Sequence, residues 1–328
     1  MARFVAVGAG RMGRGIAIAF AYAGHQIVLV DLKPRPAADW DRLQAEARAE
    51  IEQSLSSLIQ LGVLNAEQRS AITARVKYVD AAGAPAALQG AELVFEGVPE
   101  TMAAKRDAFE KISAYCSEDA IITSTTSSLA VSKLAPLVKG PDRFMNIHWL
   151  NPAYIIPVVE LSTHAGTAPS VLERAKAIME QIGKLPVVCS DAPGYIVPRL
   201  QALIMNEAVR MIEEGAATAE EIDKATRYGL GLRFAALGVV EFIDFGGADI
   251  LHHASREMSL SVDAARYKAP AILDHLIANG QLGLKTGSGF YDYAGRDLAA
   301  YRSDVLNRTL GMLKHAGMWK PPAEKTVD

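Results

Sequence analysis

Three groups of polar residues have the types and positions for proton transfer at a hydroxyl group. His148 ends an apolar run and is followed by an Asn-Pro turn at Asn151, and Glu160 lies inside a second apolar run, residues 155–161. Residues 123–128, Thr-Ser-Thr-Thr-Ser-Ser, end a third run. An unpartnered carboxylate is costly to bury, so Glu160 needs a donor, and an imidazole N–H is a natural one. The pattern favours a catalytic histidine paired with a glutamate.

The same residues also have structural interpretations, and the residues alone leave both open. A lone histidine is usually a structural residue. The hydroxyl run could cap a helix that starts at Leu129, and Glu160 could face solvent at the edge of a sheet.

The N-terminal segment has the pattern of a dinucleotide-binding βαβ unit. An apolar run breaks into Gly8-Ala9-Gly10-Arg11-Met12-Gly13, a helical stretch follows, and a second apolar run ends on Asp31, 18 residues after Gly13. Such glycines permit a tight turn, close approach of a pyrophosphate and packing of helix on strand. The helix N-terminus offers free N–H groups to the phosphates. The residues of this turn that are expected to contact the cofactor are Gly8, Gly10, Arg11, Met12 and Gly13.

Asp31 predicts which cofactor binds. A carboxylate at this position accepts hydrogen bonds from the ribose diol of NAD and repels the 2′-phosphate of NADP. Lys33 and Arg35 follow closely and could partly accommodate a phosphate. Because the acid is nearest to the ribose, we predict NAD.

The elements that must hold these residues alternate between short apolar runs and helical patterns up to about residue 190. This rhythm predicts an α/β domain over residues 1–190, a Rossmann fold with a doubly wound, mostly parallel sheet. A helical hairpin over residues 37–73, broken at Gly62, is expected to project from it. The expected strands are 4–8, 27–31, 76–79, 93–97, 120–123, 144–148, 158–161 and 185–189.

Residues 191–194, Asp-Ala-Pro-Gly, are expected to form a turn and a domain hinge. Beyond them the pattern becomes helical, which predicts an all-α domain over residues 191–328. Its expected helices are 195–214, 219–228, 239–258 and 270–279. The polar segment 320–328 contains two prolines and is expected to be loose.

Composition excludes several classes of partner. The 328 residues carry a net charge of −3, with 34 basic and 37 acidic residues, which recommends neither nucleic acid nor an anionic membrane surface. No apolar run approaches the roughly 18 residues that span a bilayer. The first strand begins at about residue 3, which leaves no room for a signal peptide. The two cysteines, Cys116 and Cys189, lack metal-ligand spacing and suit a reducing cytoplasm. We therefore expect a cytoplasmic protein.

Motifs over nearly the whole chain resemble those of the 3-hydroxyacyl-CoA dehydrogenases. The matching segments are residues 95–100 (FEGVPE), the hydroxyl run, and residues 148–152 (HWLNP), 193–196 (PGYI), 206–208 (NEA) and 285–291 (KTGSGFY). The resemblance implies a Rossmann domain followed by an α-helical substrate and dimerisation domain. It also implies NAD-dependent oxidation of an L-3-hydroxyacyl-CoA, with a role in fatty acid metabolism and a homodimeric state.

The resemblance also implies roles for single residues. His148 matches the general base of the family, Glu160 the carboxylate that orients it, and Ser127 the hydroxyl that contacts substrate and nicotinamide. The positions that match NAD contacts of the family are Glu100, Lys105, Asn151 and Lys285. Lys285 could instead be a solvated lysine, and Glu100 an acid favoured by the dipole of the following helix.

These roles agree with the chemistry of alcohol oxidation. The reaction removes a proton from oxygen and a hydride from carbon, and neutral His148 can accept the proton while the nicotinamide accepts the hydride. Glu160 would hold the tautomer of the ring and stabilise the imidazolium. No metal is required.

The chain departs from the family at three places that bear on the substrate. Pro198 stands where members usually carry a substrate-contacting Asn, and it is tolerable only in the first turn of a helix that starts near Val197. Residues 151–157 (NPAYIIP) replace a typical Asn-Pro-Val-Pro-Val-Met-Lys and are more similar to L-gulonate 3-dehydrogenase and carnitine dehydrogenase. The hairpin tip, residues 61–65, lacks the lysines of CoA-using members.

Two substrate classes therefore stay open, a short-chain 3-hydroxyacyl-CoA, slightly favoured, and a free 3-hydroxy acid. A carboxylate of a free acid could be recognised by Arg199 or Tyr154, although both residues also have structural interpretations. A non-catalytic, crystallin-like NAD-binding protein is disfavoured by the intact Ser127, His148 and Glu160. A lysine-based dehydrogenase of the 3-hydroxyisobutyrate type is disfavoured by the His-x-x-Asn-Pro segment.

Overall fold

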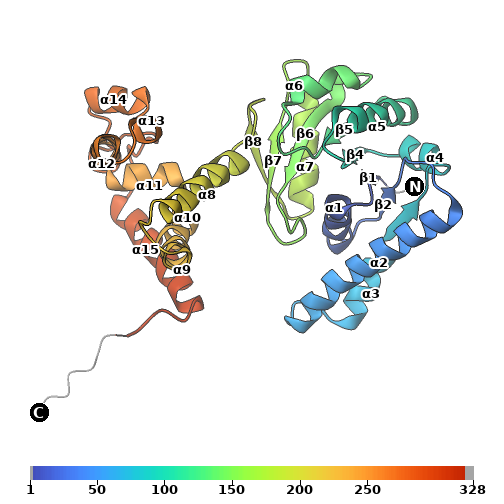
Figure 1. Ribbon diagram of the computed structural model, residues 1–328, viewed down its shortest axis with the longest axis horizontal. Helices are drawn as coiled ribbons and strands as arrows, with labels where there is room; N and C mark the ends of the chain where they lie inside the picture. Colours follow the sequence, from blue (N-terminus) through green and yellow to red (C-terminus); the bar gives the residue numbers. More distant parts are fainter. Residues whose placement is uncertain (1–2, 322–328) are drawn as a thin grey trace, which may run out of the picture. The chain divides into compact units, whose positions relative to one another are not determined.

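The protein is described by a computed structural model over residues 3–321. The chain divides into two compact units, Met1–Met205 and Asn206–Asp328 (Figure 1). The segment expected to be loose lies outside the described residues from position 322 onward. None of the helices in the described part combines the length and the apolar character needed to cross a membrane.

The first unit is built on an eight-stranded sheet with the order β3-β2-β1-β4-β5-β6-β7-β8. All neighbouring strands are parallel except β6 and β7, which pair antiparallel. The predicted α/β fold class is confirmed, and each predicted strand is present to within one residue at each end. The strands are β1 (Phe4–Val7), β2 (Ile27–Val30), β3 (Val76–Val79), β4 (Leu93–Glu96), β5 (Ile121–Ser124), β6 (Phe144–Trp149), β7 (Val158–Ser162) and β8 (Leu185–Cys189).

Helices cover both faces of this sheet, which explains why its inner strands are mostly apolar. In β1, Phe4 and Ala6 pack into one core layer, while Val5 and Val7 pack into the other. The first layer is closed by α1 (Arg11–Tyr22) and α7 (Pro169–Gln181). The second layer is closed by α4 (Ala84–Gln89), α5 (Met102–Tyr115) and α6 (Val131–Leu134). Two short 3₁₀ turns, η1 (Ala135–Leu137) and η2 (Pro141–Arg143), lead into β6.

The predicted helical hairpin is confirmed as α2 (Ala37–Gln60) and α3 (Ala66–Ala74), which lie side by side (Figure 1). Gly62 adopts a φ of +72° at the break. Asn65 and Gln68 form a reciprocal capping box at the start of α3, which fixes the turn. Ile51 and Leu55 of α2 are buried in the same core layer as α1.

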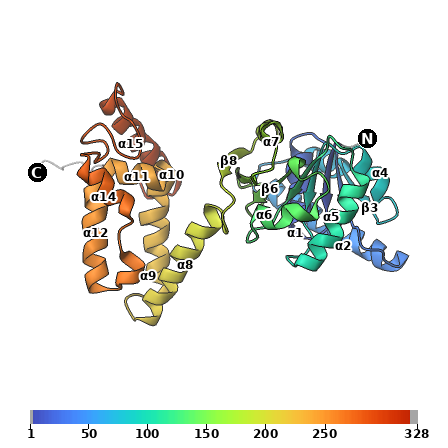
Figure 2. The same ribbon diagram turned by 90° about the horizontal axis from the view of Figure 1, so that it is seen from above.

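Helix α8 (Val197–Glu213) runs from the first unit into the second and begins at Val197, as the position of Pro198 predicts. The second unit is otherwise helical, and α12 and α14 lie side by side in it (Figure 2). Its further elements are α9 (Ala219–Ala225), the π-helical η3 (Thr226–Gly231), α10 (Leu232–Ala236), α11 (Val239–Gly246), α12 (Ala248–Ser261), α13 (Ala264–Tyr267), α14 (Ala271–Ala278) and α15 (Leu298–His315).

The helix predicted over residues 239–258 is wrong as a single element. Gly247 breaks it with a φ of +117°, a conformation that ends α11 and starts α12. The buried Asp244 just before the break accepts the N–H groups of Phe290 and Tyr291 (3.0 and 2.9 Å). These contacts come from a segment more than forty residues away, so the helical periodicity does not reveal them.

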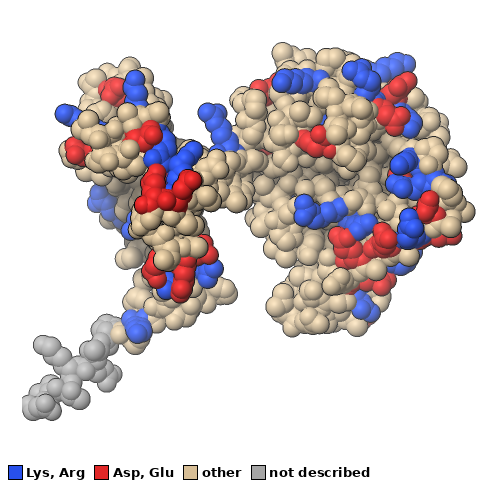
Figure 3. All heavy atoms as spheres, viewed as in Figure 1, with Lys and Arg blue, Asp and Glu red and all other residues tan. Residues whose placement is uncertain are grey.

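Within the second unit, α8 is held to α13 by a polar cluster around Glu207. Arg266 donates to both carboxylate oxygens of Glu207 (3.2 and 3.0 Å), and the Tyr267 hydroxyl also donates to it. The hydrogen bond from Tyr267, together with Arg266, holds the pKa of Glu207 below its usual value. On the face drawn in Figure 3, basic and acidic side chains are interspersed on both units.

Candidate active site

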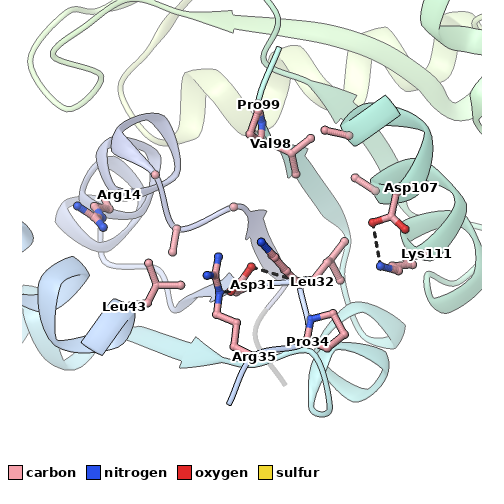
Figure 4. A pocket seen from close by; sticks show the side chains of 17 residues that line it. Arg14, Asp31, Leu32, Pro34, Arg35, Leu43, Val98, Pro99, Asp107 and Lys111 are labelled. Carbon is pink, nitrogen blue, oxygen red and sulfur yellow. Dashed lines mark hydrogen bonds and ion pairs between the residues drawn. The ribbon is translucent and has the colours of Figure 1, made fainter. Parts of the chain in front are cut away.

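A cavity of about 830 Å³ opens at the carboxyl ends of β1, β2 and β4 (Figure 4). The order of the sheet reverses between β1 and β4, and nucleotides bind at such switch points of open α/β sheets. The lining comes from residues 8–10, residues 31–35, residues 97–99 and α5, with Arg14 and Leu43 contributed by α1 and α2. The cavity is therefore where the sequence pattern places the dinucleotide.

The three glycines of the first turn meet the demands of that pattern. A Cβ on Gly8, whose φ is +105°, would lie 2.6 Å from the carbonyl oxygen of Gly97. A Cβ on Gly13 would lie 2.0 Å from the carbonyl oxygen of Gly8, so α1 could not pack so closely on the turn. Gly10 faces open space and caps α1 without a side-chain hydrogen bond. The backbone N–H groups at this helix start fit the pyrophosphate of NAD.

Asp31 lies in the cavity, where it is buried and already has two partners. One carboxylate oxygen accepts the backbone N–H of Lys33 (3.2 Å), and the other is ion-paired with Arg35. Figure 4 shows Asp31 and Arg35 next to each other in the lining. The carboxylate of Asp31 lies where the sequence pattern predicts the group that accepts the ribose hydroxyls. The pattern does not require the guanidinium of Arg35 that is paired with it.

His148 and Glu160 are brought together by the one antiparallel pairing of the sheet, which sets them opposite each other on β6 and β7. Nδ1 of His148 lies 2.7 Å from Oε2 of Glu160, and both side chains are buried. Oε1 of Glu160 accepts the N–H groups of Ile196 and Val197 (2.9 and 2.8 Å) at the start of α8. The alternative of a solvent-facing Glu160 at a sheet edge is wrong, because β7 is paired on both sides.

Tyr195 is a residue of this site to which the sequence analysis gave no role. Its ring stacks on that of His148, with centroids 5.6 Å apart and an interplanar angle of 30°. Its hydroxyl donates to the carbonyl of Leu129 (3.0 Å), and burial raises its pKa. Tyr195 has a φ of 43°, in the left-handed region that non-glycine residues rarely adopt. The sequence feature that points to Tyr195 is the Pro-Gly-Tyr segment, which is part of the family resemblance.

Residues 125–128 of the hydroxyl run form a loop after β5. The run does not cap a helix at Leu129, so that alternative is wrong. The next helix, α6, begins at Val131, and its first N–H groups are accepted by Asp191. Thr126 Oγ1 instead accepts the N–H of Leu129 within the loop (3.1 Å), and Ser127 is exposed. The hydroxyl of Ser127 is thus available to a ligand, although its contact with substrate stays a prediction.

Lys105 and Glu100 belong to a polar network beneath this loop. The buried Lys105 donates to Glu96 (2.9 and 3.1 Å) and lies 3.1 Å from a carboxylate oxygen of Glu100. Glu100 also accepts the hydroxyls of Thr126 and Ser128. Burial raises the pKa of Glu100, but these hydrogen bonds and the charge of Lys105 outweigh burial and hold it below its usual value. Glu96, a buried acid, was missed because its partners come from other elements.

The loop after His148 is held by Lys184, a third residue that the sequence analysis missed. Its ammonium donates to the carbonyls of Ala153 and Ile156 (2.6 and 2.8 Å), and burial lowers its pKa. Asn151 is exposed at the start of the loop, and Tyr154 packs against the core. Lys285 lies in the second unit, where it pairs with Asp249 (2.5 and 2.6 Å). The NAD contacts of Asn151 and Lys285 stay predictions.

Sequence profiles of the 3-hydroxyacyl-CoA dehydrogenase NAD binding domain and C-terminal domain match residues 4–192 and 194–293. The chain belongs to the 3-hydroxyacyl-CoA dehydrogenase family. It is 31% identical over 307 residues to the 5-formyl-3-hydroxy-2-methylpyridine 4-carboxylate 5-dehydrogenase of Mesorhizobium japonicum, covering 93% of this chain and 95% of the relative. It is 30% identical over 295 residues to a 3-hydroxybutyryl-CoA dehydrogenase of Clostridioides difficile, covering 89% and 99%.

A crystal structure of a 3-hydroxyacyl-CoA dehydrogenase from Archaeoglobus fulgidus has a TM-score of 0.75 at 26% identity, over 97% of this chain and 100% of that chain. The predicted family, fold class and cofactor are confirmed. The protein is an NAD-dependent oxidoreductase of this family, which acts on 3-hydroxyacyl-CoA or related hydroxy substrates.

Proposed function

We propose that the protein reversibly oxidises the hydroxyl of an L-3-hydroxy substrate to the 3-oxo product, and that the substrate is a short-chain 3-hydroxyacyl-CoA. The observation that carries the proposal is the buried His148–Glu160 pair on two neighbouring strands of the nucleotide-binding sheet. Bound NAD supplies the hydride acceptor. Such a function would place the protein in fatty acid metabolism.

The geometry of the pair defines what each residue does. With both oxygens of Glu160 accepting hydrogen bonds, the ionised carboxylate fixes the proton of the imidazole on Nδ1. The lone pair on Nε2 is then free to take the proton of the substrate hydroxyl. The stacked ring of Tyr195 keeps the imidazole in one plane. Ser127 follows β5, the strand that pairs with β6, and Asn151 follows β6 itself. Both residues are exposed and would orient the substrate and the nicotinamide.

The relatives support the thioester, since one of them is named a 3-hydroxybutyryl-CoA dehydrogenase. A free hydroxy acid is the second candidate, favoured by three observations. Pro198 lies in the first turn of α8 and offers no side-chain donor. The hairpin tip exposes Leu61 and Val63 where a lysine could bind phosphate. The relative from Mesorhizobium japonicum acts on a pyridine carboxylate.

The proposed function is tested by following NADH formation with L- and D-3-hydroxybutyryl-CoA as separate substrates. We expect turnover of the L enantiomer only, because His148 offers a base from one fixed direction. Equal turnover of both enantiomers, or no NADH from any 3-hydroxy thioester or free acid, would contradict the proposal.

We further propose that the protein is a homodimer, and that residues 191–328 form the dimerisation domain. Helix α8 carries a row of exposed apolar side chains, which usually become an interface. They are Leu200, Leu203, Ile204, Met205, Val209 and Ile212. Light scattering at micromolar concentration should give about twice the chain mass of 35.1 kDa. Leu203→Glu and Val209→Glu, each at a side chain 64% exposed, should shift the mass toward the monomer. A wild-type monomer would contradict the proposal.

A cytoplasmic location is also proposed. It is supported by Cys116 and Cys189, which form no disulfide within the described residues, as is usual in a reducing compartment. Burial raises the pKa of the Cys189 thiol to about 11.

A further inference from the structure

The Asp31–Arg35 ion pair gives the nucleotide cavity a feature that NAD recognition alone does not need. A carboxylate is sufficient to bind the ribose diol, and its negative charge is what repels a 2′-phosphate. Here the guanidinium of Arg35 is paired with one oxygen of that carboxylate. The charge that a 2′-phosphate would meet is therefore much smaller than that of a lone aspartate.

Arg35 also has hydrogen-bond donors that the ion pair with Asp31 does not use. A guanidinium carries five N–H donors in a planar fork that matches phosphate geometry, and the ion pair with Asp31 uses Nε. Among residues 3–321, Asp31 is the one ion-pair partner found for Arg35, whose side chain is 31% exposed and lines the cavity. Because Arg35 contacts the ribose acceptor directly, its remaining donors lie within reach of a group on the 2′-oxygen.

Lys111 is another cation of this cavity, and unlike Arg35 it does not contact Asp31. It also lines the cavity and is similarly exposed, at 30%, but it pairs with Asp107 on its own helix α5 (2.8 Å; Figure 4). Lys111 has no contact with Asp31 among the described residues. A loss of charge at Lys111 therefore changes the general potential of the cavity and leaves the ribose acceptor intact.

We propose that Arg35 is a second determinant of cofactor choice, a cation held by Asp31 that gives the site measurable affinity for NADP and binds the 2′-phosphate when the carboxylate is removed. Asp31 then sets the preference for NAD, and Arg35 sets how strong that preference is. The inference concerns the chain's selection between two cofactors and does not depend on which hydroxy substrate is oxidised.

The test measures dissociation constants of NADH and NADPH by titration calorimetry, without substrate, for the wild type, Arg35→Gln, Asp31→Ser and the double variant. We expect Arg35→Gln to weaken NADPH about 10- to 100-fold, the range for a hydrogen bond to a charged group, and NADH less than about threefold. Asp31→Ser should strengthen NADPH relative to NADH, and the double variant should lose most of that gain. Lys111→Gln should change the ratio of NADPH to NADH affinity far less than Arg35→Gln does.

Three results would overturn the proposal. One is that Arg35→Gln weakens NADH and NADPH equally, which would make Arg35 a structural residue of the loop. Another is an equal gain in NADPH affinity from Asp31→Ser with and without Arg35. The third is a Lys111→Gln variant that reproduces the selective loss. Wild-type NADPH binding too weak to titrate would contradict the measurable affinity for NADP. The comparison of Asp31→Ser with the double variant then decides whether Arg35 binds the 2′-phosphate once the carboxylate is removed, with thermal unfolding confirming that both variants are folded.

Discussion

Replacing His148 with alanine is expected to lower kcat for alcohol oxidation by about 10²–10⁴-fold, the range for removal of a general base. NADH binding should stay within about twofold, because His148 lies outside the residues that line the nucleotide cavity. The measurements are steady-state NADH formation and NADH titration on the same variant. His315→Ala, at an exposed histidine near the end of α15, is the matched control and should leave kcat unchanged.

The pair also predicts the effect of a change at its second residue. Oxidation needs a free lone pair on Nε2 of His148, and the contact between Nδ1 and Glu160 keeps the ring proton on the other nitrogen. Glu160→Gln should lower kcat by a smaller factor than His148→Ala, because the ring stays stacked on Tyr195 but its tautomer is no longer fixed. A His148→Ala variant with near-normal turnover would rule out the mechanism.

The parts of the fold that sequence predicts best are those in which local pattern and tertiary environment agree. The six inner strands, β1, β2, β4, β5, β6 and β7, are buried on both faces, so each is a short, mostly apolar run bounded by polar or glycine residues. The edge strands β3 and β8 are only partly buried. Helix α15 was missed because Val305 is its one buried residue and it has no sustained apolar stripe. The break at Gly247 was missed because it depends on Asp244 and a distant loop.

The residues of the candidate site also differ in how well the sequence predicts them. His148 and Glu160 could be paired from sequence, because an acid inside an apolar run demands a donor and the two lie on neighbouring strands. The roles of Tyr195 and Lys184 could not be predicted from sequence. Tyr195 stacks on the ring of His148, which is nearly fifty residues away, and Lys184 donates to backbone carbonyls rather than to a complementary side chain. A side chain that hydrogen-bonds to backbone carbonyls can pair with any residue type, so the sequence contains no matching partner from which the contact could be predicted.

The second large effect concerns the substrate. We expect kcat/KM for 3-hydroxybutyryl-CoA to exceed that for 3-hydroxybutyrate, L-gulonate and carnitine by more than about 10³-fold, some 4 kcal/mol of differential transition-state binding. The physical reason is that a thioester adds binding energy remote from the reacting carbon, which a free acid cannot supply. The measurement is initial-rate NADH formation with each substrate at matched pH.

Two variants separate the thioester from the free acid. Pro198→Asn introduces a side-chain donor and acceptor in the first turn of α8, next to the N–H groups that Glu160 accepts. Leu61→Lys introduces a cation at the exposed tip between α2 and α3. If the protein uses CoA, both variants should raise kcat/KM for the thioester, while the values for the free acids stay within about twofold. If a free acid is the substrate, Pro198→Asn should instead lower kcat/KM for that acid, because Pro198 then shapes a pocket that no thioester enters, and the wild type should prefer the acid.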